Sequence, residues 1–454
     1  MDLDRRSLLS AGLTASAALA ATAAAAAGPR KPVLEISQLT VAELALNPKS
    51  LDDQTAKLQA AIDDSATSRA PLHLPAGTFR TSALTLRPGS CIAGAGALTK
   101  LEFTGGASFI TGEDADGIVI EDLAIDGAML GLDPSAGTGL ISLRRCQKIQ
   151  LRNITISRSL FDGIALAECS GRIADCSIVD IHQTGVLSLD AKGLEIARNR
   201  VIGCGNNGIQ VWRTEPGEDG SIVSGNRVER IAAKAGGTGQ NGNGISVFRA
   251  GGVLVTGNRV ADCAYSAIRA NAASNIQMVA NSCARLGEVA LYAEFGFEGA
   301  LIASNIVDTA ASGIVVTNFN EGGRLGIVQG NLVRNLFRRE FEIEDKRGIG
   351  ISIEADSLVT GNTVEGAPTA GIQIGWAQYM RDCAATQNLI RNCTVGILIT
   401  AHPDAGSCLI AQNMISGATE GAIRAMRNGL PTGPDLAREG TGSSRVKLSG
   451  NVGV

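Results

Sequence analysis

The sequence predicts an all-β solenoid in which short parallel strands stack coil upon coil. The first observation is a turn asparagine, often after glycine and before a β-branched strand, that recurs at intervals of 23 to 38 residues. These asparagines are Asn199, Asn226, Asn258, Asn281, Asn305, Asn331, Asn362, Asn388, Asn413 and Asn451. The second is a Gly-Ile-x-Val-like strand motif, found at 208–211, 244–247, 313–316, 350–353, 371–374 and 396–399. Repeats of this length are typical of stacked units, none of which buries its apolar face alone.

The composition fits a long array of small coils. With 454 residues, 44% of them hydrophobic, the chain can bury a large core, and an array grows by adding coils rather than domains. The 56 glycines follow no G-X-Y period, which excludes collagen. The net charge is −4 and the sequence shows no basic stripe, so we expect no nucleic-acid partner.

The N-terminus predicts export. Arg5 and Arg6 directly precede a weakly apolar, Ala-rich stretch that ends in small residues suited to cleavage. We interpret 1–27 as a twin-arginine (Tat) signal, with a Sec signal or a disordered Ala-rich tail as alternatives. The Tat export machinery is then a partner, and the mature protein is periplasmic or secreted. No later stretch approaches 18 consecutive apolar residues, so we expect no membrane span after signal removal.

Residues 28–80 are predicted to be a linker and an N-terminal cap. A helix is expected to open at 51–55, because Leu58, Ala61 and Ile62 share one helical face. Residues 72–79 predict a strand, a turn and a second strand. A helix there would cover the unpaired edge of the first coil.

Residues 81–454 are predicted to form the repeats. Within them, the Gly-, Pro- and Ser-rich stretch 428–444 is interpreted as a loop, and 445–454 as a last partial coil. The turn asparagines are expected to form a ladder along the stacking axis and to tolerate the left-handed backbone of a sharp corner. The ten cysteines form no C-x-x-C pair, and most lie in apolar strands. We expect mostly free buried thiols, with one bridge between neighbouring coils as the alternative.

The sequence also resembles a known superfamily. Asp53, 58–62 and 74–79, followed by the Gly-Asn coils, resemble the opening and repeats of pectin-lyase-like, single-stranded right-handed parallel β-helices. Together with Arg5-Arg6, the whole mature chain resembles a bacterial family of twin-arginine-translocated β-helix repeat proteins with no assigned function. The acidic signatures of polygalacturonase-type hydrolases and the Trp-x-Asp-His type signature of the major pectate lyases are not found. The resemblance therefore predicts a fold and leaves the reaction open.

The superfamily resemblance implies that carbohydrate lies along the outer face of the first strand of each coil. Aligning the Gly-Ile-x-Val motifs places a mixed set of polar and aromatic side chains on that face, walled by the insertions 232–243 and 337–347. The candidate substrate-binding residues are Gln210, Trp212, Arg213, Arg249, Asn271, Asn318 and Trp376. The candidate catalytic residues are Arg269, Tyr292, Glu294 and Glu354.

Two reactions fit these residues. A lyase could use Arg269 or Tyr292, predicted on adjacent coils, to accept the C5 proton of a uronate, while another cation offsets the uronate charge. A hydrolase could use Glu294 and Glu354, predicted two coils and hence about 9–10 Å apart, a spacing compatible with inversion. The competing interpretation is a solvated sheet face without catalytic function.

We expect no resident cofactor. Calcium, the usual lyase cofactor, needs converging oxygen ligands, but Asp190, Glu294 and Glu354 are dispersed among coils. The three histidines, His73, His182 and His402, are also far apart, and each is interpreted as a lone surface or turn residue.

Two function hypotheses follow. In the first, the exported β-helix binds an extracytoplasmic polysaccharide or cell-envelope glycan along its first sheet, and in its stronger form cleaves that glycan by lyase or hydrolase chemistry. In the second, the protein is a non-catalytic envelope or surface protein whose coils act as a rigid spacer. The low aromatic content, 3%, favours the second, whereas the Arg/Tyr/Glu cluster favours the first.

Overall fold

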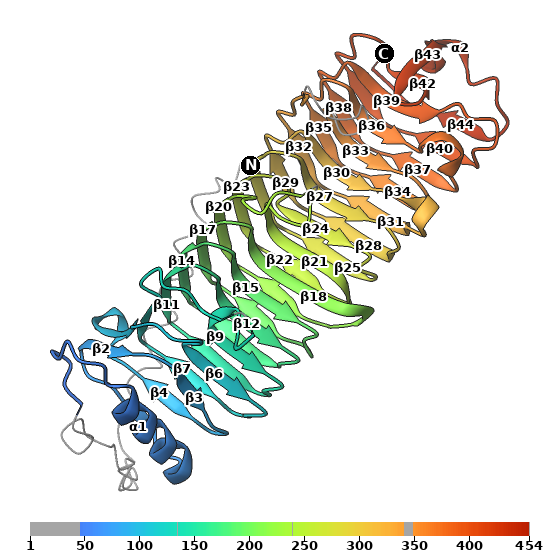
Figure 1. Cartoon of the computed structure of the whole chain (residues 1–454). Coiled ribbons are helices and arrows are strands. Elements are labelled where there is room, and N and C mark those ends of the chain that lie inside the picture. The colour runs from blue at the N-terminus through green and yellow to red at the C-terminus, as the bar shows by residue number, and fades with distance from the viewer. Residues whose placement is uncertain (1–45, 134, 238, 340–347, 454) are drawn as a thin grey trace, which may run out of the picture. The chain divides into compact units, whose positions relative to one another are not determined.

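A computed structural model describes residues 46–133, 135–237, 239–339 and 348–453. These residues form a right-handed parallel β-solenoid, which confirms the predicted fold. Three sheets of 15, 14 and 15 strands run along the stack (Figure 1). The predicted signal at 1–27 and the first part of the predicted cap lie outside the described residues.

Each coil contributes one strand to each sheet, in the order A, B, C. Sheet A consists of β1 (Leu72–His73), β4 (Cys91–Ala93), β7 (Val119–Glu121), β10 (Ile149–Arg152), β13 (Gly171–Ala174), β16 (Glu195–Ala197), β19 (Ile222–Ser224), β22 (Leu254–Thr256), β25 (Ile276–Val279), β28 (Glu298–Ala303), β31 (Arg324–Gln329), β34 (Ser357–Thr360), β37 (Cys383–Thr386), β40 (Cys408–Ala411) and β44 (Val446–Ser449). Sheet B consists of β2 (Gly77–Thr81), β5 (Thr99–Phe103), β8 (Ala124–Asp126), β11 (Thr155–Ser159), β14 (Ser177–Ile181), β17 (Arg200–Cys204), β20 (Arg227–Ile231), β23 (Arg259–Cys263), β26 (Ser282–Leu286), β29 (Ile306–Asp308), β32 (Leu332–Arg334), β35 (Thr363–Glu365), β38 (Leu389–Arg391) and β41 (Met414–Ser416). Sheet C consists of β3 (Leu84–Leu86), β6 (Ile110–Glu113), β9 (Gly139–Arg144), β12 (Asp162–Ala167), β15 (Thr184–Leu189), β18 (Asn207–Glu218), β21 (Asn243–Gly251), β24 (Ile268–Asn271), β27 (Val289–Glu294), β30 (Ser312–Val316), β33 (Ile349–Ile353), β36 (Ala370–Ile374), β39 (Val395–Thr400), β42 (Ile423–Arg427) and β43 (Leu430–Asp435). Short 3₁₀ helices interrupt the turns at η1 (Gly96–Leu98), η2 (Phe319–Glu321) and η4 (Ala377–Tyr379).

The N-terminal end is covered by helix α1 (Thr55–Ser68), as predicted. Its buried face is formed by Leu58, Ala61 and Ile62, with Ser65. The helix also satisfies the unpaired edge of β3, because the Gln59 side chain both donates to the Thr85 carbonyl and accepts from the Thr85 amide, each at 2.8 Å. The open edge of sheet C is therefore blocked against pairing with another chain.

The predicted asparagine ladder is confirmed. Each ladder asparagine accepts at Oδ1 from the backbone and side-chain amides of its predecessor, as Asn258 does from Asn226 at 2.9 and 3.0 Å. Its own Nδ2 donates back to the preceding coil, to the Val223 carbonyl in this case. The expectation that these asparagines adopt the left-handed conformation is wrong, because the residue before each one does so, for example Gly257 with φ 64°. That residue forms the turn. The asparagine after it therefore stays extended, and its side chain points inward.

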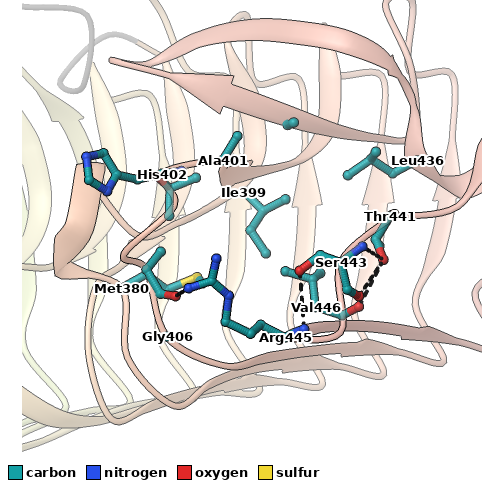
Figure 2. A pocket seen from close by; sticks show the side chains of 13 residues that line it. Met380, Ile399, Ala401, His402, Gly406, Leu436, Thr441, Ser443, Arg445 and Val446 are labelled. Atoms are coloured by element: carbon teal, nitrogen blue, oxygen red, sulfur yellow. Dashed lines mark hydrogen bonds between the residues drawn. The ribbon is translucent and has the colours of Figure 1, made fainter.

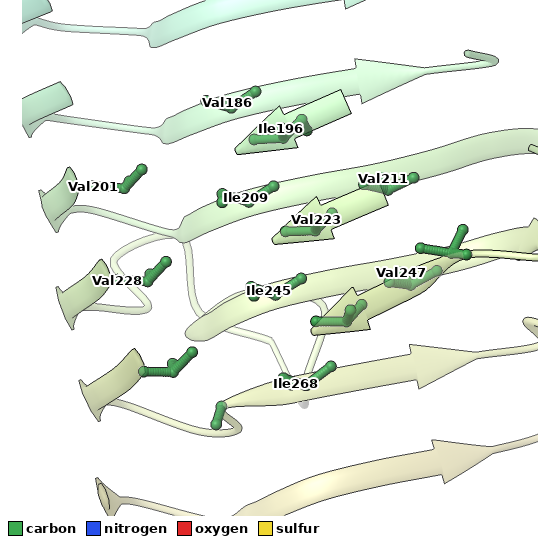
Figure 3. Packing of buried hydrophobic residues seen from close by; sticks show 14 of the residues in the cluster. Val186, Ile196, Val201, Ile209, Val211, Val223, Val228, Ile245, Val247 and Ile268 are labelled. Carbon is green, nitrogen blue, oxygen red and sulfur yellow. The ribbon is translucent and has the colours of Figure 1, made fainter. Parts of the chain in front are cut away.

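The core is a set of inward columns of branched aliphatic residues. Val201 and Val228 of sheet B, Ile209 and Ile245 of sheet C and Val223 of sheet A converge on the axis (Figure 3). All ten cysteines are free, and nine of them are buried, as expected for small apolar residues of the coil interior. The alternative of an inter-coil bridge is not realised.

The C-terminal end corrects one prediction. Stretch 428–444 is not simply a loop, because it contains β43 and the short helix α2 (Leu436–Glu439). Strand β43 pairs antiparallel with β42 and closes the last edge of sheet C. The hairpin turn is Asn428-Gly429, with φ 51° and 79°, the conformation that favours this dipeptide. Residues 446–449 then add a strand to sheet A, which confirms the last partial coil.

No helix in the described ranges is both long and apolar enough to cross a membrane.

Candidate functional site

The structure confirms the register that the Gly-Ile-x-Val motifs predict on sheet C. Side chains from seven consecutive coils lie next to each other in one outward row, which we name the sheet C column. Its members are Gln210, Ser246, Arg269, Tyr292, Val315, Ser352 and Gln373. A second row beside it contains Trp212, Phe248, Asn271 and Glu294. The alternation of the strand thus places the predicted site residues on one face.

This face is not solvated. Arg269 is 7% exposed, Tyr292 4% and Glu294 2%, although all three point away from the coil interior. The solvated-face interpretation is therefore wrong for the centre of the sheet C column. Buried charges require partners, because an uncompensated ion in a low-dielectric site is very unfavourable.

Five residues from adjacent coils provide these partners and form what we name the Arg269 cluster: Arg269, Asn271, Glu288, Tyr292 and Glu294. Arg269 Nε donates to Glu294 Oε1 at 2.6 Å, and Asn271 Nδ2 donates to the same oxygen at 3.0 Å. Arg269 Nη1 lies 3.6 Å from Glu288 Oε2. The guanidinium carbon also lies 5.1 Å from the centre of the Tyr292 ring.

The charges in this cluster determine the state of the guanidinium. Burial favours the neutral form of Arg269, but Glu294 and Glu288 outweigh it and raise the pKa of Arg269 above its ordinary value. The side chain is therefore a fixed cation at any physiological pH. It can balance a developing negative charge, but it does not accept a proton.

The predicted insertion 232–243 covers the cluster. Gly239, with φ 121°, lies so close to Arg269 that a Cβ there would come within 1.6 Å of Nη1. The Gly239 carbonyl accepts from Asn243 Nδ2 at 2.7 Å, and the Gly237 carbonyl accepts from the Tyr265 hydroxyl at 3.1 Å. Glycine is required here because the loop both bends left-handed and packs directly on the guanidinium. Most of the second insertion, 337–347, lies outside the described residues.

Glu354 is held separately from the cluster. It follows β33 and, by extension of the register, lies two coils beyond Glu294, as predicted. Its Oε2 accepts from the Phe319 amide at 2.7 Å, whereas Glu294 is bound to Arg269 and Asn271. Glu294 and Glu354 are thus oriented by different partners. Of these two carboxylates, only Glu294 contacts Arg269.

The aromatic end of the face is more open. Trp212 and Phe248 are half-buried and pack edge to face, with ring centres 5.7 Å apart. Trp212 Nε1 donates to Ser246 Oγ at 3.1 Å, which fixes the indole. Arg249 stacks over Phe248 at 4.8 Å, and Arg213 donates to the Glu215 carbonyl. This end offers two aromatic rings beside two cations.

Of the remaining predicted residues, Gln210 lies in the sheet C column, where its Oε1 accepts from Thr184 Oγ1 at 3.2 Å. The other two lie in the turns after sheet C. Asn318, with φ 72°, accepts from the Phe295 amide, and Trp376 is half-buried just before η4. Sequence reasoning missed Glu288, because it precedes the strand and follows no alternation. It also missed Asp356, whose pKa is lowered to about 2 by hydrogen bonds from Arg381 and Arg324.

A separate hollow of about 210 Å³ lies near the C-terminal end (Figure 2). It is lined by residues of β39, the following turn and the C-terminal segment, among them His402 and Arg445, and by Met380, which directly follows η4. Arg445 Nη1 donates to the Ala405 carbonyl at 2.8 Å, and His402 lies at a turn beside Asp404. No group of three His, Cys, Asp or Glu side chains in the described ranges could hold a metal ion. The hollow therefore has no evident chemistry.

Comparisons with known proteins agree with the geometry. The model of the right handed beta helix region matches residues 107–238 and, overlapping them, 162–331. A crystal structure of the bacteriophage phi29 gene product 12 N-terminal fragment is similar, with 14% identity, 91% of this chain and 70% of that chain covered, and a TM-score of 0.50. Also similar are a PL6 alginate lyase in complex with a trisaccharide (13% identity, 89% and 95% covered, TM-score 0.49) and PfbA, a surface adhesin of Streptococcus pneumoniae (11%, 86% and 93%, 0.49). The search of curated proteins found no match. At such identities the likeness shows the fold alone.

Proposed function

We propose, from the premise that this chain is a right-handed parallel β-helix protein, that it is exported and binds an acidic polysaccharide along the outer face of sheet C. The observation that supports this best is the arrangement of that face. Seven coils align one outward row of polar and aromatic side chains, with a half-open aromatic end and a buried cation in the middle. A linear polymer with repeating hydroxyl and carboxylate groups matches a surface that repeats along one axis.

The aromatic end is the proposed entry to the binding face. Trp212 and Phe248 present apolar rings on adjacent coils, and sugar rings have apolar faces that pack against such surfaces. Arg213 and Arg249 follow them directly and can form bidentate hydrogen bonds with a uronate carboxylate. Because all four are half-buried rather than covered, they bind without rearrangement of the fold.

Cleavage is the finer part of the proposal, and lyase chemistry fits better than hydrolysis. In β-elimination, Tyr292 as phenolate takes the C5 proton, the C4=C5 double bond forms as the C4–O bond breaks, and the Tyr292 hydroxyl returns the proton to the leaving oxygen. Arg269 balances the charge that develops on the uronate. A hydrolase pair needs two carboxyl groups facing one bond, whereas Glu294 is bound to Arg269 and Asn271 and Glu354 to the Phe319 amide. The loop 232–243 has to open before a polymer reaches Arg269.

One observation favours the second candidate, a non-catalytic envelope or surface protein. All four candidate catalytic side chains are buried, and the charge of Arg269 is already held by two carboxylates, Glu294 at 2.6 Å and Glu288 at 3.6 Å. In that case the cluster holds the loop 232–243 on sheet C, and partners bind to the other faces of the solenoid.

The test combines binding and turnover. The protein is titrated with polygalacturonate and alginate by calorimetry, and the same mixtures are followed for unsaturated uronate absorbance and new reducing ends. We expect binding that falls at least tenfold in Trp212→Ala and turnover that disappears in Tyr292→Phe. Tyr379→Phe, which removes a hydroxyl outside the Arg269 cluster and its covering loop, is the matched control. Intact polymers and no binding heat would contradict the glycan hypothesis; binding without turnover would contradict only the cleavage.

Export is tested independently. We expect Arg5→Lys/Arg6→Lys to retain the protein in the cytoplasm of a Tat-competent bacterium, while the unchanged chain reaches the periplasm or medium. Export of the double variant at the normal level would contradict the twin-arginine signal.

A further inference from the structure

Sheet B carries a row of arginines that the linear sequence conceals. Arg200, Arg227 and Arg259 are 27 and 32 residues apart in the sequence, but they are direct register partners on three consecutive strands, β17, β20 and β23. All three are exposed. We name this row the arginine column. The expectation that the chain has no basic stripe holds for the linear sequence and is wrong for the folded surface.

The arginine column departs from the rule that the other charged register pairs follow. Elsewhere a cation usually faces a carboxylate on the next coil. Such pairs are Arg80–Glu102, Arg144–Glu113, Arg152–Glu121, Arg172–Glu195, Arg324–Glu298, Arg334–Asp308 and Arg391–Glu365. Among the register pairs of the described strands, cation faces cation only in the arginine column. Like charges directly opposite each other on neighbouring strands are destabilising, and here the strands are about 4.8 Å apart.

The surrounding carboxylates do not neutralise the arginine column. Arg227 Nε pairs with Glu229 at 2.7 Å, but in the described part of the chain neither Arg200 nor Arg259 has a carboxylate partner. The nearby Asp262 is bound by Arg285, and Asp175 by Arg198, each at 2.6 Å. The guanidinium groups of Arg200 and Arg259 therefore offer all their donors to solvent.

We propose that the arginine column binds a linear polyuronate, with successive carboxylates seated on successive arginines. Each guanidinium can form a bidentate pair with one carboxylate, and binding relieves the repulsion between the stacked cations. The ligand that fits is an extended chain with one carboxylate per repeat and a repeat close to the strand spacing of about 4.8 Å. Ser177 and Ser282 extend the column by a hydroxyl at either end.

Two features favour a polyuronate over a nucleic acid. The arginine column is three coils long, and the whole chain has a net charge of −4, which disfavours a dense polyphosphate. The row also stands on a flat strand face without the aromatic platforms on which nucleic-acid bases stack. The inference shares its ligand class with the proposed function but concerns a different sheet.

The test removes the three charges and keeps polar, unbranched side chains at the three positions. Binding of polygalacturonate is measured by calorimetry at 50 and 200 mM NaCl for the unchanged protein and for Arg200→Gln/Arg227→Gln/Arg259→Gln. We expect at least a tenfold loss of affinity at the lower salt and a shallower salt dependence in the triple variant. The control is Arg198→Gln/Arg285→Gln, which removes two exposed arginines that are already paired, and should change affinity less than twofold.

The outcomes separate this proposal from binding on sheet C. Equal affinity of the triple variant and the unchanged protein, with loss only in Trp212→Ala, overturns the arginine column and leaves the proposed function standing. Loss only in the triple variant supports the column and contradicts sheet C. Tighter binding of inorganic polyphosphate than of polygalacturonate overturns the ligand class. Circular dichroism and a thermal melt of each variant confirm that the solenoid is intact.

Discussion

Two faces of the same solenoid carry arginine at outward strand positions, but they differ in how far the arginine is buried and whether it is paired with a carboxylate. On sheet C, Arg269 is 7% exposed, lies under Gly239 and is held by Glu294 and Glu288. On sheet B, Arg200 and Arg259 face solvent, and neither has a carboxylate partner among the residues that the structure describes. Strand geometry is the same in both places, so the loop between sheets B and C makes the difference. Where the loop folds over the face, each charge needs a partner; where it does not, water stabilises the charge and a ligand can replace the water.

The largest effect should come from removing the buried cation. Arg269→Ala leaves Glu288 and Glu294 covered with their main counter-charge gone, and such a change costs about 3–5 kcal/mol. Arg259→Ala, on the open face, should stay within about 0.5 kcal/mol. The comparison is made by urea unfolding followed by circular dichroism, with midpoints compared directly because long repeat arrays can lose two-state behaviour. Equal shifts of the two midpoints would show that the cluster is not held by its charges.

The next effect sharpens the comparison at two adjacent residues of one turn. Asn258 points inward and is bonded to Asn226, Asn281 and the Val223 carbonyl, whereas Arg259 points outward into solvent. Asn258→Ala leaves several buried amide and carbonyl groups without partners, with an expected loss of about 2–3 kcal/mol. Hydrogen exchange should rise at Asn226 and Asn281, the ladder neighbours, and remain unchanged in Arg259→Ala. Unchanged protection in Asn258→Ala would contradict a stabilising role of the ladder.

A pH series compares Asp162, whose pKa is raised by burial, with Asp356, whose pKa is lowered by arginine partners. Burial raises the pKa of Asp162, at the start of β12, to about 6, although the Thr184 amide donates to it at 2.9 Å. The folded state therefore holds this proton to higher pH than the unfolded state, so stability falls as pH rises from about 4 to 6. At about 1.4 kcal/mol per pKa unit, the loss is on the order of 3 kcal/mol. Asp162→Asn should remove this decline, which is measured by urea midpoints at pH 4, 5, 6 and 7.

Asp356 should behave in the opposite way. Hydrogen bonds from Arg381 and Arg324 lower its pKa to about 2, so its contribution is present above pH 4 and is lost as pH falls toward 2. Asp356→Asn should lower the midpoint at pH 7 and converge with the unchanged protein at pH 2. A pair of variants that shift in the same direction would show that the burial of Asp162 and the arginine hydrogen bonds of Asp356 do not control the pKa values of these two carboxyls.

The sequence predicted the periodic part of this structure and missed the aperiodic part. Period-two alternation and the small residue that starts each Gly-Ile-x-Val motif place Gln210, Ser246, Arg269 and Tyr292 in the correct row. The turn asparagines are recognisable because each makes the same contacts. The burial of Arg269 could not be predicted in this way, because it depends on the path of the loop 232–243, which repeats nowhere.

Two other misses have different causes. The hairpin of β42 and β43 had a readable signal, Asn428-Gly429, which was outweighed by the Gly and Pro content of the following residues. The arginine column had a signal too, an arginine directly after the turn asparagine, at Arg200, Arg227 and Arg259. It becomes visible only when the coils are aligned on the asparagines rather than on the glycines.

The smallest expected effect tests the repulsion in that column. Arg259→Gln removes one of two neighbouring like-charge contacts and no ion pair, so the protein should become more stable by about 0.2–0.5 kcal/mol at 20 mM NaCl. Salt screens exposed charges, so the gain should vanish at 1 M NaCl. Arg285→Gln, which breaks the pair with Asp262, should change stability in the opposite direction under the same conditions. A stabilisation of Arg259→Gln that persists at 1 M NaCl would have to come from packing, and the column would then no longer present stored repulsion for a polyanion to relieve.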